Sequence, residues 1–372
     1  MTCSPQRGLT GLMRRSLLVA IAAVLLLVGT PLHADDLVFR FFETYLEALR
    51  AQSGIPGVSA AIVGDSDIIW ERAFGQQDVE HSVPTSSITP FHVDGLTEIV
   101  TASLLLRCTE EGKISLNDTV GQYASLNPEP NPLAGVDPST TIFQILTHTS
   151  GASDNLAYAY RPERFSALEG VFRACSDHSF RRNLETQLDN LAMGDSVPGP
   201  DVIRLAPPSV GMATKEQVAH YTAVLQHLAT PYSVDTKGRA TPSQYTTTTL
   251  TESGGVISTT RDLAKFDVAV RQGIFARADT LTASWQAPVG RNGQRLPHAI
   301  GWFVQSYKGE TVLWQFGMQE NASSSLVIKL PGRGLTLILL ANGDGLVKAF
   351  SPTAGDVTIS PFGRVFLGLF VR

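Results

Sequence analysis

The chain has 372 residues, of which 43% are hydrophobic and 17% are charged, and its formal net charge is −5. A chain of this length and composition buries the core of one large domain or of two closely packed ones. It shows no basic face, long run of like charge, low-complexity tract or fixed-period repeat, so we expect no nucleic acid among its partners.

The N-terminal residues 1–34 have the three-part layout of a secretory signal peptide. The basic first part holds Arg7, Arg14 and Arg15. An apolar run follows from Leu17 to Val28, and Ala34 offers a small residue at the cleavage point. The run is shorter than the about 20 residues that a membrane-spanning helix needs. We predict cleavage near Ala34, a periplasmic or secreted protein and no stable membrane span after cleavage. An uncleaved membrane anchor is the alternative.

Two of the three cysteines lie outside this segment, because Cys3 is part of it. Cys108 and Cys175 reach an oxidising compartment if the chain is exported. They form either one disulfide or two small buried apolar side chains, and two cysteines alone do not decide between these.

The first elements after the signal are a helix and a hairpin. Apolar side chains recur at helical spacing from Val38 to Leu49, and Asp36 is the predicted N-cap. Two strands follow, Val58–Val63 and Ile68–Phe74, with a polar turn between them.

The middle of the chain is predicted to be mainly helical. The expected helices are Leu96–Glu111, Thr141–Thr147, Arg164–Ala174 and Arg261–Gly273. In the last of these, the spacing places Asp262 and Lys265 outward and the apolar residues inward.

Strands return at the end of the chain. They are predicted at Gly301–Ser306, Thr311–Phe316, Ser324–Lys329 and Leu335–Leu340, before a closing helix at Phe362–Val371. We therefore predict an α+β fold, with one antiparallel sheet built from the N- and C-terminal segments, flanking helices and a large inserted helical region. The sheet part covers 35–90 and about 290–372, and the mainly helical part covers about 91–289 of one domain, 35–372.

Four groups of segments carry a family resemblance. They are Thr89–Glu98 with Glu110–Asp118, then Ile145–Gly151, then Gly254–Phe266, and finally Gly301–Phe303 with Trp314–Gly317 and Leu340–Asn342. In this order and spacing they resemble the β-lactamase-related serine hydrolases, which include class C β-lactamases, penicillin-binding proteins, D-alanyl-D-alanine peptidases and esterases. The resemblance implies the serine β-lactamase and penicillin-binding-protein-like fold.

The first motif of that family is S-x-x-K, in which the serine attacks a carbonyl and the lysine one helical turn later takes its proton. The resemblance places Gly95 at the serine position and Glu98 at the lysine position. Glycine cannot form an acyl-enzyme, and glutamate supplies no amine. No serine in the chain is followed three residues later by lysine, and no G-x-S-x-G motif is present.

The two other motifs of the family are also degenerate. Tyr-x-Asn corresponds to Tyr160 and Pro162, so the tyrosine is kept while the asparagine is lost. The third motif, a cation followed two residues later by glycine, corresponds to Gln315 and Gly317. Gln315 forms hydrogen bonds but carries no positive charge.

Each remaining polar or aromatic candidate has a functional and a structural interpretation. Glu98 is either a new general base assisted by Tyr160 or, as we favour, an acid in the first turn of a helix. His148 and Ser150 are expected to be scaffold residues, and His220 and His227 lack a third zinc ligand. Tyr160, Trp314, Gln315 and Gly317 are the candidates for a ligand cleft, although Trp302 and Trp314 favour core packing. We expect no metal and no cofactor.

These patterns predict a catalytically inactive homologue with a binding or regulatory role in the cell envelope. Its partner would be a cell-wall peptide, an acyl ligand or another protein. Two alternatives stay open, namely a hydrolase of esters, peptides or β-lactams that uses non-standard residues, and a scaffold without a ligand.

Overall fold

The computed structural model describes residues 1–2, 34–128, 135–152, 155–204, 214–348 and 355–371. The chain divides into two compact units, Met1–Phe41 and Phe42–Arg372. Almost all of the predicted signal peptide falls outside the described residues. None of the helices in the described ranges is long and apolar enough to cross a membrane.

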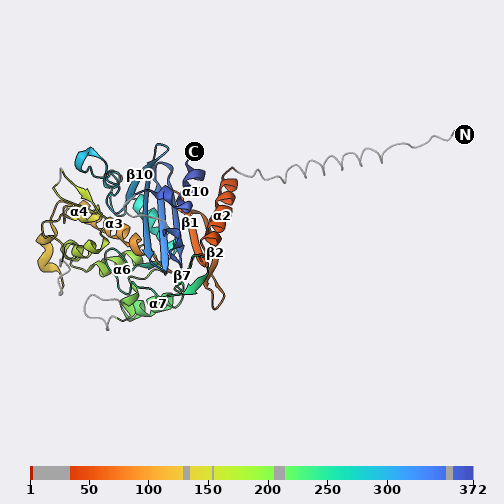
Figure 1. The fold of residues 1–372 in the computed structure, drawn as a ribbon, viewed down its shortest axis with the longest axis horizontal. Coiled ribbons are helices and arrows are strands. Elements are labelled where there is room, and N and C mark those ends of the chain that lie inside the picture. Colours follow the sequence, from red (N-terminus) through yellow and green to blue (C-terminus); the bar gives the residue numbers. More distant parts are fainter. Residues whose placement is uncertain (3–33, 129–134, 153–154, 205–213, 349–354, 372) are drawn as a thin grey trace. The chain divides into compact units, whose positions relative to one another are not determined.

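A seven-stranded antiparallel sheet forms the centre of the second unit, with the strand order β10-β11-β12-β13-β1-β2-β3 (Figure 1). The strands are β1 (Gly57–Val63), β2 (Ile68–Asp78), β3 (Val83–Pro84), β10 (Phe303–Tyr307), β11 (Glu310–Gln319), β12 (Ser323–Leu330) and β13 (Leu335–Ala341). Val58 pairs with Ala341, so the two ends of the chain meet in the middle of the sheet. The predicted α+β fold is therefore confirmed.

Helices lie on both sides of this sheet, with α3, α4 and α6 on one side and α10 on the other (Figure 1). The helices are α2 (Ala34–Gln52), α3 (Thr97–Glu110), α4 (Ile142–Leu146), α5 (Glu169–Ser176), α6 (Phe180–Asn190), α7 (Lys215–Leu225), α8 (Thr260–Arg271), α9 (Ala278–Ser284) and α10 (Pro361–Phe370). Short two-stranded pairs join β4 (Phe91–His92) to β9 (Ile257–Ser258), β5 (Thr149–Ser150) to β6 (Ala157–Tyr158), and β7 (Tyr232–Val234) to β8 (Ala240–Pro242).

Alternation along the strands divides the core between the two faces of the sheet. Ile338 and Leu340 of β13 belong to the same buried cluster as Leu104 of α3 and Leu263 of α8. On the other face, Phe42 of α2 contacts Trp70 of β2 at a ring distance of 5.2 Å and Phe366 of α10 at 6.1 Å. The sheet is thus buried on both faces.

Three details differ from the predicted elements. α2 begins at Ala34, so Asp36 lies within the helix and is not its N-cap. The predicted helix Arg164–Ala174 is two elements, the 3₁₀ helix η3 (Pro162–Leu168) and α5.

Asp262 was predicted to point outward but is fully buried. It accepts hydrogen bonds from the Asp195 N–H at 2.8 Å and from the Ser196 hydroxyl at 2.9 Å, and tertiary donors of this kind cannot be read from helical spacing.

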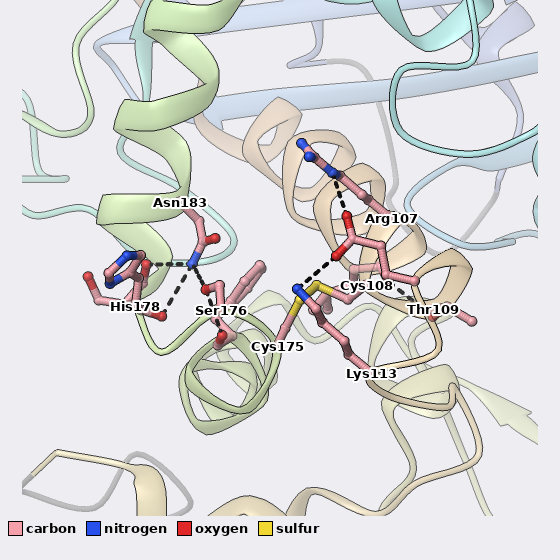
Figure 2. The surroundings of a disulfide bond; sticks show 12 residues. Arg107, Cys108, Thr109, Lys113, Cys175, Ser176, His178 and Asn183 are labelled. Atoms are coloured by element: carbon pink, nitrogen blue, oxygen red, sulfur yellow. Dashed lines mark hydrogen bonds and ion pairs between the residues drawn. A yellow bond between two sulfur atoms is a disulfide. The ribbon is translucent and has the colours of Figure 1, made fainter.

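Cys108 and Cys175 form a disulfide, which settles the choice that the sequence left open. Their Cα atoms are 5.8 Å apart. Figure 2 shows the bond between α3 and α5, with Lys113 beside it. Asn183 of α6 donates to the Ser176 hydroxyl at 2.8 Å, so α6 is tied to the end of α5 in the same region (Figure 2).

Candidate functional site

The start of α3 is held by the ends of two sheet strands. The 3₁₀ helix η1 (Asp94–Leu96) leads directly into α3. Asp94 has a φ of 47° and accepts hydrogen bonds from Gln319 at 2.7 Å and from Ser323 at 3.0 Å. Burial raises the pKa of Asp94 to about 6 despite these two bonds. Gly95 and Glu98 are therefore positioned by contacts of η1 with β11 and β12.

Glu98 is the centre of a buried hydrogen-bond network. Its Oε2 accepts from His148 Nε2 at 3.0 Å and from Gln315 Nε2 at 2.9 Å. Its Oε1 accepts from the Tyr160 hydroxyl at 2.9 Å. The carboxyl group has no exposed surface. One side chain of α3 thus binds β11 and the segment that carries β5 and β6.

Neighbouring backbone groups determine which atoms donate in this network. The Arg161 N–H donates to His148 Nδ1 at 3.0 Å, so the His148 proton resides on Nε2 and points at Glu98. The Phe316 N–H donates to Gln315 Oε1 at 3.0 Å, so the Gln315 amide nitrogen faces Glu98. Both neighbours of Glu98 Oε2 are therefore N–H donors.

Burial shifts the ionisation of every titratable member of the network. It raises the pKa of Glu98 to about 8, against the opposing hydrogen bonds of Tyr160 and Gln315. It lowers the pKa of His148 to about 3 and, together with the neighbouring Glu98, raises the pKa of Tyr160 well above its ordinary value. Since Oε2 faces only N–H groups, a proton on Glu98 lies on Oε1 beside the Tyr160 oxygen.

The position expected for the nucleophile has no room for a side chain. A Cβ atom on Gly95 would lie 2.4 Å from the Phe316 carbonyl oxygen, 3.3 Å from the Tyr160 hydroxyl and 3.5 Å from the Gly317 Cα. A Cβ atom on Gly317 would lie 2.3 Å from the Val93 carbonyl oxygen. The two glycines therefore let β11 pack directly against η1, and the cleft is closed at this point.

The structure brings five predicted residues together and leaves two outside. Gly95, Glu98, Tyr160, Gln315 and Gly317 converge as described. Pro162 begins η3 and takes no part in the Glu98 network. Trp314, a predicted cleft residue, is fully buried and stacks on Phe303 at 4.2 Å, because its side chain points into the packed interior from β11.

Comparison with known proteins identifies the family of the chain. The Beta-lactamase family profile matches residues 42–354. The chain belongs to the Beta-lactamase family. Among curated relatives, Protein flp of Staphylococcus aureus (strain NCTC 8325 / PS 47) is 28% identical over 117 residues, which is 31% of this chain and 22% of that protein. The putative penicillin-binding protein PbpX of Bacillus subtilis (strain 168) is 28% identical over 98 residues, 26% of this chain and 23% of that protein. The matched segment thus spans about a fifth of each relative.

Solved structures share the fold of this Beta-lactamase family member at low sequence identity. The octameric penicillin-binding protein homologue from Pyrococcus abyssi has a TM-score of 0.67 at 18% identity, covering 88% of this chain and 77% of that one. A class C β-lactamase from Rhodobacter sphaeroides has a TM-score of 0.62 at 17% identity, covering 88% and 97%.

Two histidines of the site were not recognised as such from the sequence. His148 was interpreted as a scaffold residue, and its bond to Glu98 was not foreseen. His298 is fully buried, and its Nε2 lies 3.5 Å from Gln315 Nε2. His148 has a φ of 51°, a left-handed conformation that residues other than glycine seldom adopt, and this marks a constrained backbone. Nothing in the sequence around His298 distinguishes it from a core histidine.

Glu98, His148 and His298 place potential metal-ligand atoms within 4.8 Å of one another. His298 on its own suits a metal, because its Nδ1 faces the Ala299 carbonyl oxygen and its Nε2 is then an acceptor, which the Gln315 amide approaches at 3.5 Å. His148 does not, because Nε2 would have to give up its proton while Nδ1 faces the Arg161 N–H. The Gln315 amide also lies between Glu98 and His298. The donor set of this family member is a closed hydrogen-bond network that does not suit a metal.

Proposed function

We propose that this protein is a non-catalytic member of the Beta-lactamase family that is exported and has a binding or regulatory role in the cell envelope. The partner proposed is a cell-wall peptide, an acyl ligand or another protein. The solved structures that share the fold include the penicillin-binding protein homologue and also FmtA from Staphylococcus aureus, whose chain is covered to 90% at 15% identity with a TM-score of 0.63.

One observation carries the proposal that catalysis is absent. The Phe316 carbonyl oxygen lies 2.4 Å from the point where any side chain at position 95 would have to begin. An acyl-enzyme needs both a nucleophile at this point and space for the acyl group. Neither can be provided without moving β11 away from η1.

The alternative of a hydrolase with Glu98 as its base receives less support. Glu98 has no exposed surface, and its oxygens are occupied by three donors. Tyr160 keeps its proton at neutral pH, because its pKa is raised well above the ordinary value. Neither group can therefore reach and activate a water molecule beside a substrate.

Export is supported by the disulfide between Cys108 and Cys175, since such bonds persist in oxidising compartments. It is also supported by the basic and apolar pattern of residues 1–34. The β-lactamase fold agrees with a cell-envelope role by analogy alone.

Covalent labelling tests the proposal. We expect the full-length protein to take up neither a fluorescent penicillin nor a fluorophosphonate probe, as read from denaturing gels beside an active class C β-lactamase. We also expect no label on the double variant Gly95→Ser/Glu98→Lys, because the new side chain at position 95 meets the Phe316 carbonyl. Label on the wild-type protein that survives denaturation would contradict the proposal. Label on the double variant alone would show that β11 moves aside readily.

A further inference from the structure

A hollow in the surface lies outside the Glu98 network. It is a polar cavity of about 730 Å³, formed by the loop 135–140, by α4 and by the segments 150–152 and 161–164. Its polar and charged walls include Asp137, Gln144, Ser150, Arg161, Glu163 and Arg164. The volume falls in the range of pockets that hold small molecules. Unlike the point above Gly95, this cavity has room for a ligand.

The two arginines of the cavity lack carboxylate partners. Among the described residues, no ion pair joins Arg161 or Arg164 to an acid. Arg164 is half-buried, and its Nη1 donates to the Thr149 carbonyl oxygen at 3.0 Å. Burial and the neighbouring Arg161 lower the pKa of Arg164, and the charge of Glu163 offsets this only in part. A carboxylate bound in the cavity would offset the repulsion between the two arginines.

The other charges of the cavity limit the kind of anion that fits. Asp137 and Glu163 also line the walls, so the cavity is neutral overall. A multiply charged anion such as phosphate would meet two carboxylates. A ligand with one carboxylate and one ammonium or amide N–H end would satisfy both signs. The planar guanidinium fork matches a carboxylate in two parallel hydrogen bonds.

From these observations we propose that this cavity binds a short peptide, with the peptide's C-terminal carboxylate held by Arg161 and Arg164. The inference rests on the binding role proposed above and moves it away from the closed position at Gly95. One residue, Arg161, connects the polar cavity to the Glu98 network. Arg161 lines the cavity, and its backbone N–H donates to His148 in the Glu98 network at 3.0 Å.

Calorimetric titration of the full-length protein tests the inference. The probes are tri-alanine with a free carboxylate, the same peptide as its C-terminal amide, and inorganic phosphate. We expect the free acid to bind at least tenfold more tightly than the amide, and phosphate to bind no better than the amide. Arg161→Gln should weaken tri-alanine binding at least tenfold.

Matched variants separate the ligand contact from a structural effect. Arg295→Gln removes an exposed arginine elsewhere and should leave the affinity unchanged. Arg164→Lys keeps the charge but loses the fork and should give an intermediate loss. Equal binding of acid and amide, unchanged affinity in Arg161→Gln, or no binding would each overturn the peptide site. These outcomes do not alter the covalent-labelling result, so the proposal of lost catalysis stands or falls separately.

Discussion

At the scale of single residues, Glu98 illustrates how a substitution takes its meaning from its surroundings. At the family's lysine position a carboxylate would be an isolated buried charge without donors, which is strongly unfavourable. Here Gln315 replaces the cation of the third motif and donates to the same carboxyl group. The two residues therefore complement each other, and together with His148 and Tyr160 they connect α3 to β11.

Replacing Glu98 tests which ionisation state the fold prefers. Glu98→Gln can keep its carbonyl oxygen toward His148 and Gln315 and turn its amide toward the Tyr160 oxygen, as the protonated acid does. It adds one buried N–H group that the acid lacks, which should cost about 1–3 kcal/mol of unfolding free energy if that group stays unpaired. The pKa of Glu98 is raised from 4.5 to about 8. The stabilisation that follows from this shift is fully present below about pH 4.5 and is lost as the pH rises through about 8.

We therefore expect the stability difference between wild type and Glu98→Gln to be largest near pH 5 and smaller at pH 9. Urea unfolding of both proteins at pH 5, 7 and 9 measures it. Buried groups outside the Glu98 network contribute equally to both proteins and drop out of the difference. A gap that grows toward pH 9 would mean that the three donors keep Glu98 ionised in the folded protein.

At the scale of elements, close approaches of the backbone decide where glycine is required. Helix α10 contains two glycines, Gly363 and Gly368, that differ in this respect. A Cβ atom on Gly363 would lie 2.5 Å from the Val357 carbonyl oxygen, whereas one on Gly368 would meet nothing within 4 Å. Both residues lie in the same helix, so alanine brings the same gain in helix propensity at each position.

We expect Gly368→Ala to stabilise the protein by about 0.5–1 kcal/mol. Gly363→Ala should destabilise it by about 1–3 kcal/mol, because the backbone carbonyl must move. Thermal unfolding of the two variants checks the opposite signs. If both variants gained stability, the contact between α10 and Val357 would be looser than the structure shows.

At the scale of the whole molecule, the disulfide connects the helical region across a sequence separation of 67 residues. Closing a loop of this length restricts the unfolded chain, and typical disulfides stabilise by about 2–4 kcal/mol. The bond joins α3, which carries Glu98, to α5. The stability of the helical region should therefore depend on the compartment in which the chain folds.

We expect the chain produced with residues 1–34 to contain the oxidised Cys108–Cys175 pair, and the chain produced without them in the cytosol to contain free thiols. Mass spectrometry after thiol alkylation distinguishes the two forms. Reductant should lower the unfolding free energy of the oxidised form by about 2–4 kcal/mol. It should leave the Cys108→Ala/Cys175→Ala variant unchanged. Free thiols in both preparations would contradict export to an oxidising compartment.

The α+β fold was predictable from the sequence because period-two and helical patterns report which face of each element is buried. The loss of the serine and the lysine was readable because Gly95 and Glu98 lie in a segment with a clear family resemblance. The outward position of Asp262 was predicted wrongly, since a polar residue is buried when donors from elsewhere in the chain satisfy it. The split of the predicted helix at Arg164 into η3 and α5 was also missed.

By itself, the sequence determined the fold class and the absence of a serine–lysine pair, because both follow from residue types at local spacing. The tertiary structure alone decided that His298 joins the site and that the two cysteines pair. It also decided that the Phe316 carbonyl occupies the space above Gly95. These features depend on distances between segments separated by tens to hundreds of residues. Such distances arise only when the sheet and the helices pack together.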